Sequence, residues 1–260
     1  MQDLKVALIQ ANLIWWNAEE NRISFSEKIN QISEQVDLVV LPEMFSTGFS
    51  MQPVAIAETM QGETVEWMQQ IAANKKCAIG GSLIISEENK YYNRFLFVHP
   101  SGKIEYYNKR HLFTLAGEDK IYTQGNEKLI VDLNGWKICP FICYDLRFPV
   151  WARNIENYDV LLYVANWPKP RVAAWDTLLK ARSIENMCYT IGVNRVGEDG
   201  NNLAYVGHSA VYDCLGEQIA ETASGKEDIA VVTLNKEHLN KVRTTLNFLN
   251  DKDAFDIKIN

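Results

Sequence analysis

The sequence predicts an α/β protein whose sheets mix parallel and antiparallel strands. Short continuous apolar runs alternate with segments in which apolar residues recur every three or four positions, as expected of buried strands separated by covering helices. Two hairpin signals add antiparallel strands. No stretch rich in proline, glycine or serine divides residues 1–260, so we expect a single domain.

The first half of the chain supplies strands, helices and one hairpin. Apolar residues at positions 25, 29, 32 and 36 are spaced 4, 3 and 4 apart, which is one face of a helix. The turn residues Pro100-Ser101-Gly102 separate the two strands of the hairpin. The expected elements are strands over Lys5–Gln10, Asp37–Leu41 and Cys77–Ser86, helices over Asn17–Val36 and Glu63–Asn74, and a hairpin of Tyr92–Val98 with Lys103–Asn108.

The second half repeats this alternation. Its hairpin turns at Leu215-Gly216 and resembles the first one, a weak internal repeat from which we expect two-fold pseudo-symmetry. The expected elements are strands over Trp136–Tyr144, Val160–Ala165, Cys188–Asn194 and Ile229–Leu234, helices over Pro149–Asn157, Ala174–Met187 and Lys236–Asn250, and a hairpin of Ser209–Asp213 with Gln218–Glu221.

Composition and charge argue against several classes of partner. The chain has 26 Lys and Arg against 33 Asp and Glu, a net charge of −7, with no basic cluster. We therefore expect neither nucleic acid nor a membrane as a partner. No apolar run reaches the roughly 18 residues that a membrane-spanning helix needs. The first residues lack the basic and apolar regions of a signal peptide.

The cysteine and histidine patterns indicate reduced thiols and no local metal site. Five cysteines are an odd number in a long chain, which favours a cytoplasmic location over a disulfide scaffold. The chain has no C-x-x-C pair and only four scattered histidines. We therefore expect no metal held by neighbouring residues of the sequence.

Two charged side chains directly follow expected strands, where α/β folds often place their active sites. Partial burial of Glu43 would raise its pKa toward that of a working base. Taken alone, Glu43 is more simply interpreted as a solvated loop carboxylate or a partner of a helix N-terminus. Lys109 follows the first hairpin and, taken alone, suits an ordinary surface cation.

One cysteine stands at the end of an apolar strand and precedes polar residues and a helix. This is the pattern of a nucleophile elbow, in which backbone N–H groups of the turn can bind an oxyanion. A free cysteine more often acts as a small hydrophobic residue. We assign that role to Cys77, Cys139, Cys188 and Cys214, but not to Cys143, because of its flanking residues.

A thiol nucleophile needs a base and a group that stabilises the anion formed on attack. His111 is one candidate base. Alternatively, Glu43 takes the proton of Cys143, while Lys109 and the Tyr144 N–H hold the oxyanion. The residues alone leave both schemes open.

The three motifs together resemble those of the nitrilase, or carbon–nitrogen hydrolase, superfamily. Glu43 lies in L-P-E-M-F-S-T-G-F, Lys109 in Y-N-K-R-H-L-F and Cys143 in I-C-Y-D-L-R-F-P, with spacings of 66 and 34 residues. Further similarity covers essentially the whole chain, through A-G-E at 116–118, N-W-P at 166–168, A-R-S-I-E-N at 181–186, G-V-N-R-V-G at 192–197 and Y-x-G-H-S at 205–209.

The resemblance implies a four-layer α-β-β-α sandwich, a thioester intermediate, and neither a metal nor an organic cofactor. Carried over to this chain, it makes Cys143 the nucleophile, Glu43 the general base and Lys109 the cation that stabilises the oxyanion. Glu118 matches the family's second glutamate, which supports Lys109 and the attacking water.

The loops look most like the omega-amidase branch, whose members hydrolyse the terminal amide of 2-oxoglutaramate and 2-oxosuccinamate and release ammonia. We therefore expect a small amide substrate, and assign Tyr144, Arg147, Trp167 and Arg171 to its pocket. A carboxylate on the substrate needs a cationic partner, and Arg147 and Arg171 are the candidates.

Two other functions remain as alternatives. A different carbon–nitrogen hydrolase, such as an N-carbamoyl amidohydrolase, would keep the same catalytic residues and differ in the loops around 45–49 and 166–171. A catalytically silent interaction protein on the same scaffold would have no need of Glu43, Lys109 and Cys143 together. Family members commonly associate, so the resemblance also implies a homodimer or a higher homo-oligomer.

Several further residues are expected to be structural. Asp145 should fix the turn that carries Cys143. Arg182 and Glu185 are spaced as an i, i+3 ion pair on a helix. The four tryptophans that we expect in the core or at an interface are Trp15, Trp16, Trp151 and Trp175.

Overall fold

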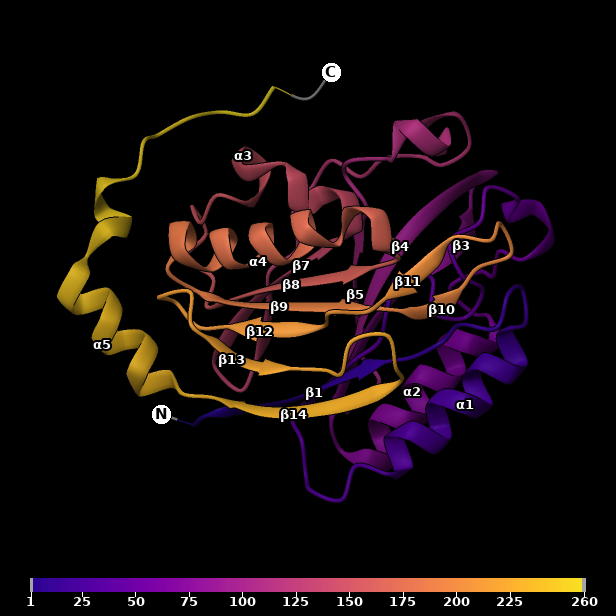
Figure 1. Cartoon of the computed structure of the whole chain (residues 1–260), viewed down its shortest axis with the longest axis horizontal. Helices are drawn as coiled ribbons and strands as arrows, with labels where there is room; N and C mark the ends of the chain where they lie inside the picture. The colour runs from indigo at the N-terminus through magenta and orange to yellow at the C-terminus, as the bar shows by residue number, and fades with distance from the viewer. Residues whose placement is uncertain (1, 259–260) are drawn as a thin grey trace.

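Two sheets pack face to face between layers of helices in the computed structural model, which describes residues 2–258 (Figure 1). Helices α1 (Ala18–Asn30) and α2 (Glu63–Lys75) cover the first sheet. Helices α3 (Pro149–Ala152) and α4 (Val172–Asn186) cover the second. The predicted α/β class and the four-layer arrangement are confirmed. The prediction of a single domain remains a prediction.

The first sheet has six strands. In sheet order they are β14 (Asp228–Leu234), β1 (Leu4–Gln10), β2 (Leu38–Val40), β3 (Ala78–Glu87), β4 (Lys90–Val98) and β5 (Ile104–Asn108). Strands β1, β2 and β3 are parallel to one another, and the other three are antiparallel to their neighbours.

The second sheet also has six strands, with β7, β8 and β9 parallel. A separate two-stranded sheet joins β10 (Val196–Glu198) to β11 (Ala204–Val206). In sheet order the six strands are β13 (Gln218–Glu221), β12 (Ala210–Tyr212), β9 (Tyr189–Asn194), β8 (Val160–Ala165), β7 (Trp136–Ile142) and β6 (Val131–Leu133).

The strand directions repeat between the two sheets. In each, three parallel strands are followed by two antiparallel ones that form a hairpin at one edge, β4–β5 in the first sheet and β12–β13 in the second. One further antiparallel strand, β14 or β6, closes the opposite edge. The similarity of the two hairpins in the sequence therefore corresponds to a repeated topology.

The side chains of β1 pack alternately into two hydrophobic clusters, one on each face of the sheet. Val6 and Leu8 belong to the hydrophobic cluster between the sheets. Ala7 and Ile9 belong to the cluster beneath α1 and α2, where they meet residues such as Phe25. Side chains on a strand alternate between its faces, so a continuous apolar run is the signature of a strand buried on both sides.

Two helices are shorter than predicted. The helix expected over Asn17–Val36 ends at Asn30, because the chain must turn before β2 begins at Leu38, although Val36 still packs in the core. The helix expected over Pro149–Asn157 ends at Ala152. There the Asn154 side chain bonds to both backbone groups of Tyr158 and holds a loop instead of a further helical turn.

The C-terminal helix also ends early. Helix α5 spans Lys236–Leu246 and stops at Asn247, whose φ is +55°. Figure 1 shows this helix and the following segment running past the end of the sandwich. Within residues 2–258, no helix has the length and apolar character needed to cross a membrane. Single turns of 3-10 helix span Pro53–Ala55, Thr114–Ala116, Glu118–Lys120, Cys143–Arg147, Lys169–Arg171 and Phe248–Asp251.

Candidate active site

Cys143 lies where β7 meets a 3-10 turn, and it is the partly exposed cysteine of the five. Its φ of +45° falls in the left-handed region, which costs free energy for any residue with a side chain. Strain of this kind persists only where the surrounding structure holds it. The turn presents the thiol at the strand end, as predicted for a nucleophile elbow.

The carboxylate of Asp145 holds this strained turn. One carboxylate oxygen, Oδ2, accepts hydrogen bonds from both the Ile142 N–H at 3.0 Å and the Tyr107 hydroxyl at 2.8 Å. Its other oxygen accepts the His111 N–H at 2.9 Å. Asp145 therefore fixes the turn, as predicted, and also ties it to the loop that follows Lys109.

Lys109 is buried rather than a surface cation, with only 1% of its side chain exposed. Its Nζ donates to Glu43 Oε1 at 3.0 Å and to Glu118 Oε2 at 2.9 Å. Both carboxylates are fully buried. One ammonium therefore faces two buried carboxyl groups, and it is the ion-pair partner of both.

Two asparagines that the sequence analysis did not assign to the site complete this cluster. The Asn93 amide donates to Glu43 Oε1 at 2.7 Å and to Glu118 at 3.3 Å, and it accepts from Ser82. The Asn166 backbone N–H donates to Glu43 Oε2 at 2.7 Å, and its side-chain amide donates to the Glu43 carbonyl. A buried asparagine inside the apolar strand β4 was the available signal, because strands disfavour asparagine.

The pKa shifts follow from burial and these charges. Burial, the charge of Glu43 and a hydrogen bond to its carboxylate raise the pKa of the Cys143 thiol well above its usual value. Burial alone would lower the pKa of Lys109, but the charges of Glu118 and Glu43 outweigh it and raise that pKa. Burial raises the pKa of Glu118 despite the neighbouring Lys109. The resting site therefore holds a neutral thiol and a firmly protonated lysine.

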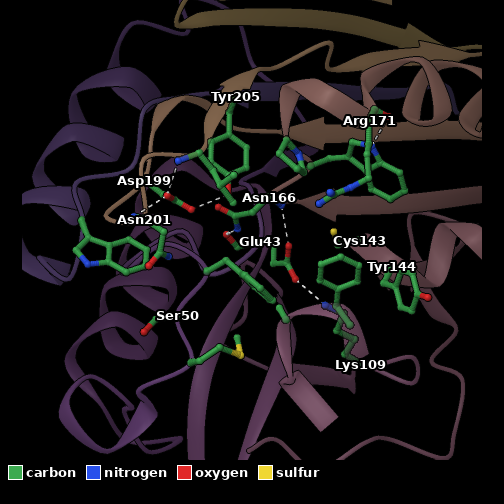
Figure 2. Close-up of a pocket in the computed structure, with 18 of the residues that line it drawn as sticks. Glu43, Ser50, Lys109, Cys143, Tyr144, Asn166, Arg171, Asp199, Asn201 and Tyr205 are labelled. Carbon is green, nitrogen blue, oxygen red and sulfur yellow. Dashed lines mark hydrogen bonds and ion pairs between the residues drawn. The ribbon is translucent and has the colours of Figure 1, made fainter. Parts of the chain in front are cut away.

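These groups open onto a cavity of about 330 Å³ (Figure 2). This volume suits a small molecule, since ligand pockets range upward from about 300 Å³. Glu118 lies behind Lys109 and does not form part of the wall. The other seven predicted site residues all line the cavity, namely Glu43, Lys109, Cys143, Tyr144, Arg147, Trp167 and Arg171.

One side of the cavity carries two arginines packed on aromatic rings. The Arg147 guanidinium lies 4.8 Å from the centre of the Trp167 ring, and that of Arg171 lies 5.3 Å from the centre of Phe113. The Trp167 indole N–H donates to the Arg171 carbonyl at 2.7 Å. Within residues 2–258, neither guanidinium forms an ion pair. Both can therefore receive an anionic group from a ligand.

The opposite side of the cavity was not predicted. The Tyr205 hydroxyl donates to Asp199 Oδ2 at 2.8 Å, and both residues line the cavity. Trp15 and Trp16, expected in the core or at an interface, lie in this wall as a stacked pair. They are only partly buried, because loops rather than sheets surround them. Trp151 and Trp175 are buried, as expected.

His111 does not serve the thiol. Its Nδ1 pairs with Asp145 at 2.7 Å, and its ring stacks on Phe148 with centroids 3.6 Å apart. It is absent from the cavity wall. The geometry therefore favours Glu43 over His111 as the base for Cys143. Among residues 2–258, no group of three or more His, Cys, Asp or Glu side chains is arranged to hold a metal ion.

A carbon–nitrogen hydrolase family model matches residues 5–244 of this chain. The chain belongs to the carbon–nitrogen hydrolase family. This hydrolase is 43% identical to the omega-amidase YafV of Yersinia enterocolitica, over 98% of this chain and 99% of that one. It is 30% identical to the 2-oxoglutaramate amidase of Bacillus subtilis, over 96% and 98% of the two chains.

A solved structure resembles this hydrolase over its whole length. The crystal structure of XC1258 from Xanthomonas campestris, a CN-hydrolase superfamily protein with an arsenic adduct in the active site, matches with a TM-score of 0.97 and 41% identity. The match covers 99% of this chain and 100% of that one. The family and fold expected from the sequence motifs are therefore confirmed.

The site of this hydrolase combines the parts that acyl transfer needs. It offers a thiol, a carboxylate within hydrogen-bonding reach of that thiol, and a buried cation. Tyr144 is the second residue of the 3-10 turn, so its N–H has no acceptor within that turn. It is therefore placed to donate to an oxyanion formed at Cys143.

Proposed function

We propose that this hydrolase is an omega-amidase, which hydrolyses the terminal amide of a small ω-amide of the 2-oxoglutaramate or 2-oxosuccinamate type and releases ammonia. The proposal rests on one small cavity that is lined by Cys143, Glu43 and Lys109 and by two arginines that form no ion pair with any described residue. The names of the relatives support the same substrate class.

The reaction starts with a neutral thiol, because the pKa of Cys143 is raised. Glu43 takes the thiol proton as the sulfur attacks the amide carbonyl carbon. The negative charge moves to the carbonyl oxygen, where the Lys109 ammonium and the Tyr144 N–H stabilise it. Removing one oxyanion donor typically costs about 10²–10³ in rate, so Lys109 is nearly indispensable in this scheme.

The tetrahedral intermediate then collapses to a thioester. The C–N bond breaks, its electron pair stays on nitrogen, and Glu43 returns the proton so that ammonia leaves. In the second half, Glu43 takes a proton from water as the oxygen attacks the thioester. The C–S bond then breaks and Cys143 regains its proton, while Glu118 holds Lys109 in place through both carboxylate oxygens.

The cationic side of the cavity provides for the acid end of the substrate. A protein with a net charge of −7 attracts no anion over long range, so a local cation must bind the substrate carboxylate. Trp167 connects the two arginines of the cavity wall. Its ring packs against the Arg147 guanidinium, and its indole N–H donates a hydrogen bond to the Arg171 carbonyl. Aromatic packing restrains both side chains before the ligand binds.

We also infer a homo-oligomer, at least a dimer, in the cytoplasm. Val150 and Phe248 are each 57% exposed and supply apolar surface on α3 and in the C-terminal segment. Trp151, the next residue of α3, is buried in the core and adds nothing to this surface. Light scattering tests the oligomeric state, and a monomer near 30 kDa at all working concentrations contradicts a homo-oligomer.

The cytoplasmic location is supported by the five reduced cysteines, which suit a reducing compartment.

Ammonia release from a panel of compounds tests the function. We expect turnover of 2-oxoglutaramate and 2-oxosuccinamate to exceed that of N-carbamoyl-β-amino acids and simple nitriles by at least about a hundredfold in kcat/KM. Preferential turnover of a carbamoyl compound would favour the N-carbamoyl amidohydrolase alternative. No turnover by the folded protein, with Cys143 no more reactive than the buried cysteines, would favour a silent scaffold.

A further inference from the structure

The cavity has a side that the proposed mechanism leaves unused. We call it the acceptor wing and define it by Asn166, Asp199 and Tyr205. Figure 2 shows these residues on the side of Glu43 opposite Cys143, with Arg171 and Tyr144 beyond the thiol. All three line the cavity, and each is more than nine-tenths buried.

Asn166 presents an unpaired acceptor in this wing. Its Nδ2 donates to the Glu43 carbonyl at 2.6 Å, so the other terminal atom must be the oxygen. That Oδ1 is buried and has no hydrogen-bond partner among the described residues. A buried acceptor without a donor is unfavourable, and at a cavity wall it marks a position where a ligand can supply the donor.

Tyr205 adds a second acceptor of the same kind. Its hydroxyl donates its proton to Asp199 Oδ2, so toward the cavity its oxygen offers lone pairs. Asp199 also accepts two backbone N–H groups through Oδ1, from Asn201 and Leu203. The Arg195 guanidinium lies 4.6 Å from the Tyr205 ring centre and offsets the charge of Asp199. The wing is therefore rich in acceptors without being strongly anionic, which suits a neutral N–H donor.

The geometry of the reacting carbon leaves one substituent for this wing. In the proposed mechanism, the carbonyl oxygen faces Lys109 and the Tyr144 N–H, and the acyl chain extends toward the arginines. The amide nitrogen must contact Glu43, which protonates it. Glu43 Oε2 is held by the Asn166 N–H at 2.7 Å, so Asn166 is the neighbour of Glu43 on the side of the acceptor wing.

We propose that the acceptor wing is the leaving-group subsite, in which Asn166 Oδ1 and the Tyr205 hydroxyl oxygen accept N–H groups from the departing ammonia. This inference rests on the proposed amidase function and assigns a site to its nitrogen product. When the C–N bond breaks, its electron pair remains on nitrogen and the proton comes from Glu43, so the product is neutral NH₃. Its N–H groups match the two acceptors, and its removal from the thioester leaves room for water.

Microscopic reversibility supplies the test. A subsite that holds departing ammonia also holds an amine that attacks the thioester. Hydroxylamine is the probe: its nitrogen attacks the thioester carbonyl, the C–S bond breaks, Cys143 regains a proton, and a hydroxamate forms. Water gives the carboxylic acid from the same thioester. The ratio of hydroxamate to acid therefore reports amine binding and does not depend on how fast the thioester forms.

The ratio is measured with 2-oxoglutaramate and fixed hydroxylamine for the wild type and four variants. Asn166→Ala and Tyr205→Phe each remove one acceptor and should lower the ratio by about fivefold or more. Like Asn166→Ala, Asn166→Asp loses the hydrogen bond from the amide to the Glu43 carbonyl, but it keeps an oxygen acceptor. Its ratio should therefore stay within about twofold of the wild-type ratio. Tyr106→Phe, at an exposed tyrosine of β5 that does not line the cavity, should leave the ratio unchanged.

Unchanged ratios in Asn166→Ala and Tyr205→Phe would overturn the subsite. An equal fall in all four variants would also overturn it, because it would indicate that the substitutions loosen the protein structure in general. These outcomes are separate from failure of the proposed function. In that case, the wild type forms neither hydroxamate nor acid from any ω-amide.

Discussion

The Lys109 ammonium lies 3.0 Å from a Glu43 carboxylate oxygen, and the exposed fraction of each side chain is at most 1%. A cation in this position can stabilise an oxyanion that forms beside the base. The same cation is shared with Glu118, so the cluster couples catalysis to stability. Substitutions of Glu43, Lys109 and Asp145 test how this cluster and the turn beside it support catalysis and stability.

Glu43→Gln should lower the pKa of Cys143 while abolishing turnover. The negative charge of Glu43 and its hydrogen bond both raise that pKa, and the substitution removes the charge. The amide cannot accept a proton, so the amidase reaction stops. Thiolate absorbance followed against pH measures the midpoint, with Cys143→Ala as the blank. A midpoint that is unchanged or higher in Glu43→Gln contradicts the electrostatic account.

Lys109→Met should destabilise the fold most at alkaline pH. Breaking a buried ion pair by removing one partner costs roughly 3–5 kcal/mol. The charge of Lys109 and its hydrogen bond lower the pKa of Glu118, so without Lys109 that pKa rises further above its usual value. A carboxyl group with a raised pKa in the folded state stabilises the fold below its unfolded pKa and loses that contribution as pH rises through the folded value.

Urea unfolding of Lys109→Met and the wild type at pH 5.5 and pH 8 measures this effect. We expect the free energy of unfolding of the variant to fall further below that of the wild type at pH 8 than at pH 5.5. A difference that does not depend on pH would show that the two carboxylates are not left as uncompensated charges.

Asp145→Asn should impair turnover more than its effect on stability explains. The amide replaces one of two oxygens that accept from Ile142, Tyr107 and His111, so the Cys143 turn and the Lys109 loop are no longer tied together. A displacement of about 1 Å at such a site costs on the order of a hundredfold in rate.

Asp159→Asn is the matched control for Asp145→Asn, because Asp159 is a buried carboxylate that accepts from Lys236 and Arg243 beside α5, away from the cavity. Kinetics and thermal unfolding of both variants separate the two effects. Equal losses of stability with kcat retained in both would mean that Asp145 does not position the site.

Arg147→Ala and Arg171→Ala test the carboxylate partner. A charge-assisted contact contributes roughly 1.5–3 kcal/mol, so losing the right arginine should raise KM about ten- to a hundredfold for a substrate that carries the carboxylate. A neutral ω-amide should be affected little. If both variants keep the wild-type preference for the acidic substrate, the carboxylate is bound elsewhere.

The cluster of Glu43, Lys109 and Cys143 could be predicted because each residue follows an expected strand and stands in a motif of the family. Their proximity came from the family motifs and not from spacing, since the residues alone left His111 open as the base. Only the structure shows that His111 pairs with Asp145 and does not line the cavity.

The hydrogen-bond partners of Glu43 could not be predicted in the same way. Asn93 reaches it because β4 pairs antiparallel with β3, with Asn93 opposite Ile84, and a shift of one residue would turn its amide to the other face. Asp199 and Tyr205 reach the cavity through the short hairpin β10–β11, which the sequence pattern did not reveal. Loop paths depend on packing that local propensity does not encode.

Cys143 as the nucleophile is tested by the mass of the enzyme quenched in acid during turnover of 2-oxoglutaramate, followed by mapping of the modified peptide. We expect an acyl adduct on Cys143, no adduct in Cys143→Ala, and loss of ammonia release in that variant. An adduct on another cysteine, or ammonia release by Cys143→Ala at more than a few per cent of the wild-type rate, would contradict it.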